Sequence, residues 1–332
     1  MSNKMFLMIR KVVLMVLVIM PVTAYSWTFD SDFEDETVGL KTNKFTDAAG
    51  GSIVSTDTST SGSKSIKLNI SQGSEGFGMW GGRKNFPVVG EGDEVWVRLK
   101  TKIPSDFDLT TNIGTLKFLR LHVQSSANAH IGYVDIYMNW DGSFKYQNEL
   151  YTTNRLVLLN QSGTYTVNEI VTGQTTGATA RVKAIKTSGA LVFDYTGSTQ
   201  FSRYERITGG SSGASATLEW VQSNSVTDFA SSNKVQRDVW ETYIYRVRFS
   251  ASRPLVQFYK AVGSTYVLLF EDASDYTLKS PTDTVDAFLL FTYWNGSSPR
   301  TQHMYVDDLL ISTEPPPEMG TRPKSVIQAP AS

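Results

Sequence analysis

Short runs in which apolar and polar residues alternate make up most of this chain. Alternation with a period of two predicts β-strands that bury one face, and the Gly, Ser, Asn and Asp residues between the runs favour turns. The runs that predict strands are 65–70, 94–103, 115–124, 133–140, 243–249, 255–260, 266–270, 287–293 and 303–312. Helical periodicity is scarce, so the chain is predicted to be all-β, a two-sheet antiparallel sandwich.

The middle of the chain contains an internal repeat. Residues 168–182 match residues 204–218 at an offset of 36, so that Glu169 corresponds to Glu205. Each copy has the pattern strand, glycine turn, strand, which indicates a repeated supersecondary unit. Because neither flanking half looks like a complete core, we predict a β module inserted into one sandwich. The sequence of the module shows no set of residues typical of a catalytic site, and its expected roles are spacing, contact or weak binding. The predicted boundaries are 161–222 for the module, and 27–160 plus 223–313 for the sandwich.

The N-terminal 26 residues have the composition of a secretory signal peptide. Basic residues up to Lys11 precede an apolar stretch at 12–20, and small residues at 24–26 suit cleavage after Ser26. The apolar stretch is shorter than the about 20 residues that span a bilayer. We therefore expect no membrane span in the mature chain, with a retained anchor as the alternative. A bacterial protein exported by a Sec-type signal, secreted or periplasmic, is predicted.

Composition narrows the function classes further. The formal net charge of −1 becomes −4 without the signal segment, which holds three cations and no acids. A mildly acidic chain without Lys/Arg blocks does not favour nucleic acid as a partner. The chain has no cysteine, which excludes disulfides and thiol chemistry. The polar residues 314–332, which begin beside three prolines, predict a disordered tail.

The predicted strand 115–124 carries a cation beside a histidine. Strict alternation places Arg120 and His122 on one face together with Phe118, opposite Leu119, Leu121 and Val123. A cation beside a group that titrates near neutral pH suits binding or deprotonation of an acidic sugar. Alternation places Lys117 on the opposite face, so a bulge or a strand end would be needed to bring it to the same side. Solvated surface cations are the alternative.

The predicted strand 133–140 has a polar and aromatic face. Its members are Tyr133, Asp135, Tyr137 and Asn139, opposite Val134, Ile136, Met138 and Trp140. Aromatic rings beside hydrogen-bonding groups suit a sugar, which has apolar C–H patches and a rim of hydroxyls. Further substrate-binding candidates are Lys117, Tyr243 and Tyr245 on strands, and Trp80, Arg83 and Trp294 at glycine-rich corners. Core packing is the alternative for each single aromatic residue.

The residue types favour elimination over hydrolysis. A glycosidase needs two carboxylates that flank the bond, and no strand shows an alternating stripe of acids. Elimination needs a group that neutralises the uronate carboxylate, a base and a proton donor. We expect Arg120 and Asn139 to neutralise the carboxylate, and Tyr137 and His122 to act as acid and base. Lys117 is a further candidate base. The predicted partner is an acidic polysaccharide.

Three acids suggest a structural metal. Glu34 lies near the mature N-terminus, and Asp307 and Asp308 lie in the last predicted strand. First and last strands are often neighbours in a closed sandwich, so these acids are expected to share a Ca²⁺ ion. Solvated or turn-capping acids are the alternative. No His/Cys cluster predicts zinc.

Several segments together resemble the concanavalin A-like jelly-roll proteins, with the polysaccharide-lyase branch as the nearest in character. They are 33–35, 78–83, 116–122, 293–296 and 305–312. The resemblance implies two packed antiparallel sheets and a concave carbohydrate groove with a basic residue, a tyrosine and often a histidine. Arg120, Tyr137 and His122 match these types. The lysine signature with a following Pro and Gly is not matched after Lys117. The repeat resembles small β modules of bacteriophage structural proteins.

The predicted function is that of a secreted polysaccharide lyase that cleaves a uronate-containing glycan by β-elimination. The alternative is a non-catalytic carbohydrate-binding or adhesion protein on the same fold. A phage-derived structural protein is a third interpretation, and it would need the inserted module to make oligomer contacts.

Overall fold

The computed structural model describes residues 26–110, 115–150, 154–186, 189–222, 225–229, 234–291, 293–294 and 296–320. The predicted signal peptide before Ser26 and the predicted tail beyond Gly320 lie outside the described residues. No helix within the described ranges is long and apolar enough to cross a membrane.

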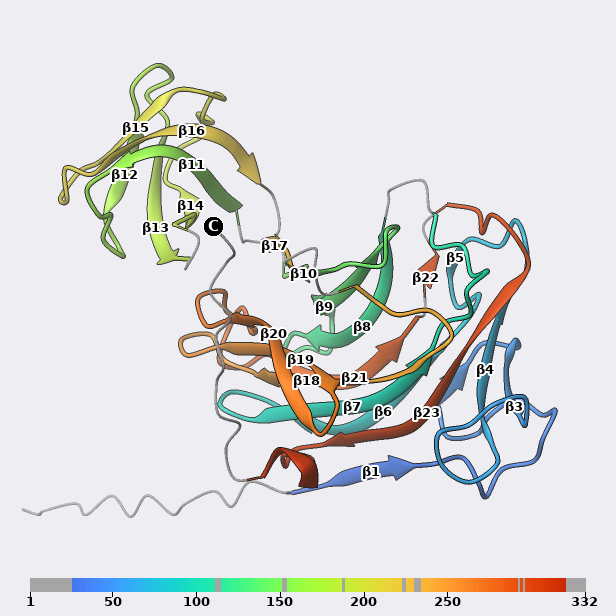
Figure 1. Ribbon diagram of the computed structural model, residues 1–332. Helices are drawn as coiled ribbons and strands as arrows, with labels where there is room; N and C mark the ends of the chain where they lie inside the picture. The colour runs from blue at the N-terminus through green and yellow to red at the C-terminus, as the bar shows by residue number, and fades with distance from the viewer. Residues whose placement is uncertain are drawn as a thin grey trace, which may run out of the picture.

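The main body is a sandwich of two antiparallel sheets, which confirms the predicted fold class (Figure 1). The first sheet runs β20-β19-β18-β7-β23-β4-β3, and β1 pairs with β23. Its strands are β1 (Thr28–Ser31), β3 (Ser52–Ser55), β4 (Ser65–Ile70), β7 (Glu94–Lys102), β18 (Trp240–Arg248), β19 (Leu255–Val262), β20 (Thr265–Asp272) and β23 (Gln302–Ser312).

The second sheet runs β17-β10-β9-β8-β21-β6-β2. Its strands are β2 (Asp47–Ala48), β6 (Gly82–Val89), β8 (Thr115–Gln124), β9 (His130–Asn139), β10 (Phe144–Asn148), β17 (Ser225–Asp228) and β21 (Thr284–Leu290). A short pair, β5 (Gly76–Phe77) with β22 (Tyr293–Trp294), and a single 3₁₀ turn at Pro317–Met319 complete the body.

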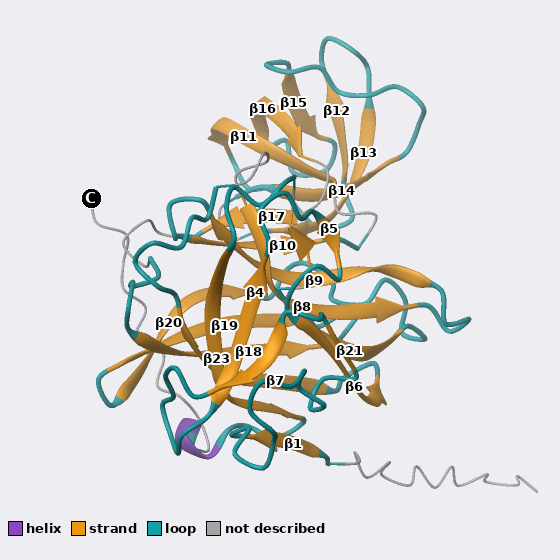
Figure 2. Cartoon of the chain, turned by 90° about the vertical axis from the view of Figure 1, so that its right-hand side faces the viewer, coloured by secondary structure: helices purple, strands orange, loops and turns teal. Residues whose placement is uncertain are grey.

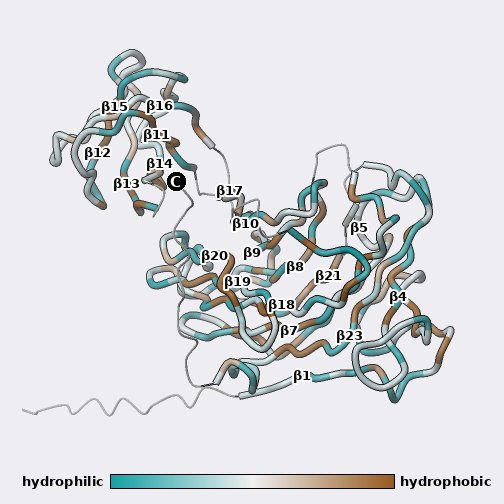
Figure 3. The backbone as a smooth tube through the Cα atoms, viewed as in Figure 1, coloured by the Kyte–Doolittle hydropathy of each residue, from teal (hydrophilic) through white to brown (hydrophobic). Residues whose placement is uncertain are grey.

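One hydrophobic core lies between the two sheets because the inward positions of both are apolar. Val95, Val97 and Leu99 of β7 and Leu119 and Leu121 of β8 belong to the same buried cluster. Figure 3 shows the hydrophobic stretches concentrated on the sandwich strands, β21 and β23 among them. At about 25 cal/mol for each Å² of apolar surface buried, this core dominates the stability of a chain without disulfides.

A closed barrel is inserted between β10 and β17, which pair with each other in the second sheet. Its strands are β11 (Asn154–Ser162), β12 (Ile170–Gly173), β13 (Thr179–Ile185), β14 (Leu191–Tyr195), β15 (Arg206–Gly209) and β16 (Ser215–Gln222). The barrel therefore begins at Asn154, seven residues before the predicted module boundary at 161. Figures 1 and 2 show it at one end of the sandwich, near β10 and β17.

In the barrel, a glutamate carboxylate of each repeat copy accepts hydrogen bonds from the turn of the other copy. The Glu205 carboxylate of the second copy accepts backbone hydrogen bonds from Thr175 and Thr176 in the turn of the first. Glu169 does the same for Ser211 and Ser212 in the turn of the second copy. The β12–β15 register has the same symmetry, with Thr172 paired to Thr208. The repeat seen in the sequence is therefore a pseudo-two-fold in space.

Buried charges join the barrel to the sandwich. Lys186, which follows β13, forms ion pairs with Asp272 and Asp275 of the sandwich. Arg155 of β11 binds the same Asp275 oxygen at 2.7 Å. All four side chains are buried. Such a network fixes one docking geometry, because any other would leave a charge unpaired and away from water.

Candidate functional site

The outer face of the second sheet carries the polar side chains of three neighbouring strands. Their apolar neighbours in sequence point the other way, into the core. Going along the strands, the rows on this outer face are Lys145–Tyr137–Lys117, Asp135–Arg120 and Tyr133–His122. The register thus gathers most of the predicted site residues of β8 and β9 on one surface.

A β-bulge brings Lys117 to this surface. The β8–β9 register shifts between Lys117 and Leu119, so Phe118 is the extra residue. Phe118 is fully buried in the core, with its ring 4.8 Å from that of Phe291. The expectations that Phe118 lies beside Arg120 and that Lys117 lies opposite it are therefore both wrong. An inserted residue reverses the alternation on one side of the bulge.

The first group of interacting side chains, the Glu149 cluster, comprises Lys117, Arg120, Asp135, Tyr137 and Glu149. Arg120 donates from Nε to Asp135 Oδ2 at 3.1 Å and from Nη2 to Glu149 Oε2 at 2.8 Å. Tyr137 donates its hydroxyl proton to Glu149 Oε1, and Lys117 Nζ lies 3.9 Å from the same oxygen. The phenol and the ammonium thus converge on one carboxylate oxygen.

Burial sets the proton affinities in the Glu149 cluster. It raises the pKa of Tyr137, and the Asp135 and Glu149 carboxylates raise it further. The pKa of Lys117 is lowered by burial and by the Arg120 guanidinium. Although burial opposes its charge, the pKa of Arg120 is raised by Asp135 and Glu149. The tyrosine therefore stays protonated, and the lysine is shifted toward its neutral form.

Arg120 does not have the position expected of a group that neutralises a substrate carboxylate. It is 1% exposed, and its guanidinium is held by two carboxylates and stacked 3.6 Å from the centre of the Tyr133 ring. Its contacts position Glu149 and Tyr133. The other predicted neutralising group, Asn139, lies at the end of β9, where its Nδ2 donates to Ser143 Oγ at 2.9 Å.

The second group, the His122 chain, comprises Arg83, Asp286, His122 and His130. Asp286 binds Arg83 Nη2 at 3.0 Å and His122 Nδ1 at 2.5 Å. His122 Nε2 lies 3.0 Å from His130 Nδ1, so both ring nitrogens of His122 are engaged. Despite burial, His122 and Arg83 lower the pKa of Asp286. Burial, His122 and Arg120 lower the pKa of the exposed His130.

Sequence reasoning missed Glu149 and Asp286, and it started the strand of His130 at residue 133. Glu149 follows the last residue of β10, and its backbone N–H still bonds Tyr133 across the sheet. Asp286 lies at a register shift in β21, between Val285 and Ala287. His130 begins β9.

Four predicted substrate-binding aromatics lie in the core instead. Tyr243 and Tyr245 are fully buried because the face of β18 that they share packs against the second sheet. Trp80 and Trp294 are also buried, with ring centroids 5.3 Å apart. Conversely, Trp140, expected on the apolar face of its strand, is 65% exposed because β9 ends at Asn139.

The acids predicted to hold calcium each accept hydrogen bonds from one surface loop. Glu34 accepts from the backbone of Ser63 at 2.9 Å and of Lys64 at 2.6 Å. Asp307 accepts from the Thr60 backbone at 2.8 Å, and Asp308 pairs with Lys100 at 2.6 Å. Among the residues that the structure describes, no group of three or more His, Cys, Asp or Glu side chains could hold a metal ion. Calcium binding stays a prediction.

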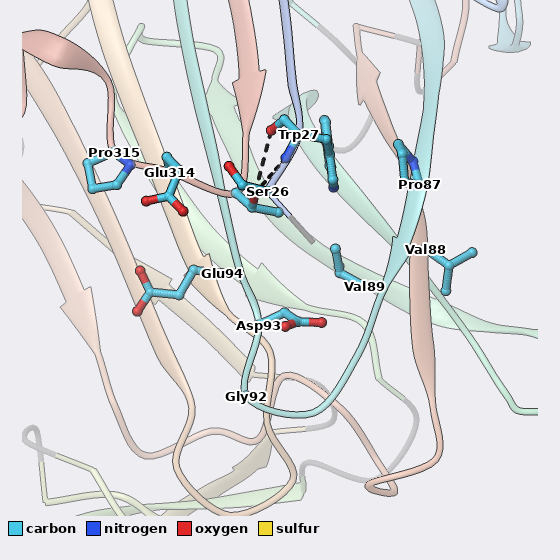
Figure 4. A pocket seen from close by; sticks show the side chains of 11 residues that line it. Ser26, Trp27, Pro87, Val88, Val89, Gly92, Asp93, Glu94, Glu314 and Pro315 are labelled. Atoms are coloured by element: carbon cyan, nitrogen blue, oxygen red, sulfur yellow. Dashed lines mark hydrogen bonds between the residues drawn. The ribbon is translucent and has the colours of Figure 1, made fainter. Parts of the chain in front are cut away.

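One hollow in the described part of the chain lies away from this outer face. It has a volume of about 260 Å³ and is bounded by Trp27, the turn between β6 and β7, and the segment after β23 (Figure 4). Asp93, Glu94 and Glu314 line it. Three carboxylates around a hollow do not suit a polyanion.

Comparison with known proteins gives a distant likeness in fold. No family model and no curated protein sequence matches this chain. An endo-β-1,4-glucuronan lyase of the fungus Trichoderma reesei is 8% identical, covering 83% of this chain and 93% of its own, with a TM-score of 0.47. An alginate lyase of Aplysia kurodai is 10% identical, covering 79% and 86%, with a TM-score of 0.43. The alginate lyase Aly36B, in complex with an alginate trisaccharide, is 11% identical, covering 86% and 97%, with a TM-score of 0.44.

Proposed function

We propose that this protein is a secreted polysaccharide lyase that cleaves a uronate-containing glycan by β-elimination on the outer face of β8–β10. The observation that carries the proposal is the row Lys145–Tyr137–Lys117 across three adjacent strands. Lys145 Nζ lies 5.5 Å from the centre of the Tyr137 ring, and Lys117 and Tyr137 share Glu149 Oε1. A phenol between one lysine cation and a second lysine shifted toward its neutral form suits an anionic sugar.

The chemistry follows from these proton affinities. The Lys145 ammonium pairs with the uronate carboxylate and makes the adjacent C5–H more acidic. The neutral amine of Lys117 takes the C5 proton, and the C–H electron pair forms the C4=C5 double bond. The C4–O bond breaks, and Tyr137 gives its phenolic proton to the leaving oxygen. The products are an unsaturated uronate and a new hydroxyl end, and proton exchange with water restores both side chains.

This assignment replaces His122 as the base. Tyr137 and Tyr133 are four residues apart on β9, about 13 Å along the strand, and His122 is the cross-strand partner of Tyr133. One glycosidic linkage is much shorter than that separation. Lys117 is directly opposite Tyr137, so it suits the same bond.

The carboxylates of this face do not form a glycosidase pair. Asp135 is fully buried and bound to Arg120, and Glu149 is bound to Arg120 and Tyr137. A hydrolase needs an acid and a base or nucleophile on opposite sides of the bond. Both carboxylates here are ion-paired to the same guanidinium.

Carbohydrate binding without cleavage is the second candidate. It is favoured by the burial of Tyr137, which is 2% exposed, because a proton donor must reach the glycosidic oxygen. On this interpretation, the Glu149 cluster only shapes the surface, and the exposed rings and cations hold the glycan.

Incubation with a panel of uronate polysaccharides tests the proposal. We expect ultraviolet absorbance from the conjugated double bond on at least one substrate. Lys117→Ala and Tyr137→Phe should each lower the rate at least about a hundredfold, the usual scale for a general acid or base. Lys183→Ala, in the barrel, is the matched lysine control and should retain the rate.

The outcomes separate the candidates. A folded wild-type protein that gives no product on any substrate contradicts the lyase proposal, and glycan binding without product favours the second candidate. If His122→Ala abolishes turnover while Lys117→Ala retains it, the assignment of the base is wrong. Near-ultraviolet circular dichroism of each variant establishes that the fold is intact.

A further inference from the structure

The two halves of the inserted barrel differ at the turn that precedes β12 in the first half and β15 in the second. Asn168 in the first half corresponds to Tyr204 in the second. Both residues have left-handed backbones, with φ of 74° and 66°. Both are fixed across the barrel, because Asn168 N–H donates to Val182 O at 2.7 Å and Tyr204 N–H donates to Leu218 O at 2.6 Å. The two turns thus have the same backbone and different side chains.

Tyrosine is a costly residue in this conformation. Asparagine is among the residues that tolerate the left-handed region, whereas a bulky side chain there is an outlier. Packing does not offset the cost, since the Tyr204 side chain is 60% exposed. Strained residues that the fold does not need are concentrated at functional sites.

Arg203 accompanies Tyr204 and replaces Val167 of the first half. Its guanidinium lies 4.6 Å from the centre of the Tyr204 ring, and its Nε donates to Glu219 O at 3.0 Å. The next residue, Glu205, is buried and accepts a hydrogen bond from the Ser202 backbone. The ring and the cation therefore stand on a turn that is held on both sides, which limits the entropy lost on binding.

We propose that Tyr204 and Arg203 form a glycan-binding site on the barrel. The ring offers its open face to the C–H face of a pyranose, and the guanidinium, which lies over the other face, offers donors to hydroxyl or carboxylate oxygens. This site is separate from the outer face of β8–β10, and its binding does not depend on cleavage there.

The surroundings favour a glycan over a protein or a nucleic acid. A stable protein interface needs an apolar centre within about 1,000 Å² or more, whereas the exposed residues 196–200 before this turn are Thr, Gly, Ser, Thr and Gln. Residues 154–222 hold six Lys/Arg and four Asp/Glu, and two of those cations are buried against the sandwich. The barrel therefore lacks the basic surface that nucleic acid requires.

Native affinity electrophoresis of the full chain, in gels that contain a uronate or a neutral polysaccharide, tests the site. The decisive variant is Tyr204→Asn, which restores the residue of the first half. We expect it to melt at the same temperature as the wild type or higher, and to bind about five- to tenfold more weakly, the loss of one stacked ring. Tyr204→Phe should retain binding, and Val167→Ala is the matched control. Arg203→Gln should weaken binding to the uronate polysaccharide more than to the neutral one.

Three results would contradict this binding site. Wild-type retardation that Tyr204→Asn leaves unchanged would place binding elsewhere on the chain, and the absence of any retardation would show that neither polysaccharide is bound. A large fall in melting temperature for Tyr204→Asn would give the ring a structural role. Retardation that depends on Tyr204 in a protein without lyase activity would contradict the lyase proposal and leave this site standing.

Discussion

At the scale of single residues, Glu149 controls the chemistry of the outer face. Its two oxygens bind Arg120 and Tyr137, and Lys117 lies within 3.9 Å of one of them. The negative charge raises the proton affinity of Lys117, whereas burial and Arg120 lower it. Glu149 therefore sets the pH at which the lysine becomes a free base.

Glu149→Gln should shift the pH profile of the lyase reaction toward acid. On the proposed mechanism, wild-type activity should rise as pH increases through the lowered pKa of Lys117, because the neutral amine would be the active form. Without the carboxylate, that pKa falls further, so the rising limb of kcat/KM moves to lower pH. Measurement of kcat/KM against pH for both proteins checks this, with Glu271→Gln on β20 as the control. A limb that stays in place or moves to higher pH contradicts it.

Sequence alternation could place His122 and Arg120, but it could not place Lys117. The alternation rule holds only while each residue opposes one partner, and Phe118 breaks it by turning into the core. Glu149 was equally invisible, since it lies one residue beyond β10 and reaches the site by pairing with Tyr133. Such effects depend on partners distant in sequence.

At the scale of elements, each half of the barrel is stabilised by hydrogen bonds from its turn to a glutamate carboxylate of the other half. Glu205 closes the turn at 173–177, and Glu169 closes the turn at 209–213. Gly173 and Gly209 lie directly against these carboxylates, where a methyl group would overlap an oxygen. The repeat therefore requires both glycine and glutamate at equivalent positions.

Glu205→Gln and Glu169→Gln should each destabilise the barrel by about 1–3 kcal/mol, because backbone donors of the opposite turn lose a charged acceptor. Backbone hydrogen bonds lower the pKa of Glu169 against the effect of burial. Its contribution is therefore complete above its ordinary pKa of 4.5 and is lost as pH falls through the lowered value. Thermal unfolding at neutral and acidic pH measures both effects, with Glu219→Gln at a half-buried position of β16 as the control. Equal melting temperatures for all three variants would contradict a stabilising role of these glutamate–turn hydrogen bonds.

Most strands of the sandwich were predictable from alternation alone. The intervals 65–70 and 115–124 coincide with β4 and β8. The strand β6 was missed because Pro87 and a run of polar residues interrupt its pattern. The hydrogen bonds between each glutamate and the turn of the other copy could not be predicted from the sequence. A sequence repeat predicts a repeated structural unit, but not how its two copies are arranged in space.

At the scale of the whole molecule, the barrel is held on the sandwich by the network of Lys186, Asp272, Asp275 and Arg155. Lys186→Met should cost about 3–5 kcal/mol, because it leaves two buried carboxylates with one cation. Limited proteolysis at the junction and thermal unfolding of the full chain measure the loss. Lys183→Met, whose exposed pair with Asp194 is 3.6 Å long, should change stability by less than about 1 kcal/mol. Similar behaviour of the two variants would show that the network does not fix the barrel.

Because β10 pairs with β17, the barrel is an insertion between two adjacent, antiparallel strands of the second sheet. Asn148 and Ser225 are cross-strand partners, so the chain leaves and re-enters the sandwich at one place. Insertions at such places are exchanged easily, because the host needs only a turn to close the gap. Here, however, the residue after Asn148 is Glu149, whose carboxylate organises Arg120 and Tyr137. A graft or deletion must therefore cut after Glu149, and a cut one residue earlier would remove the barrel and the centre of the candidate site together.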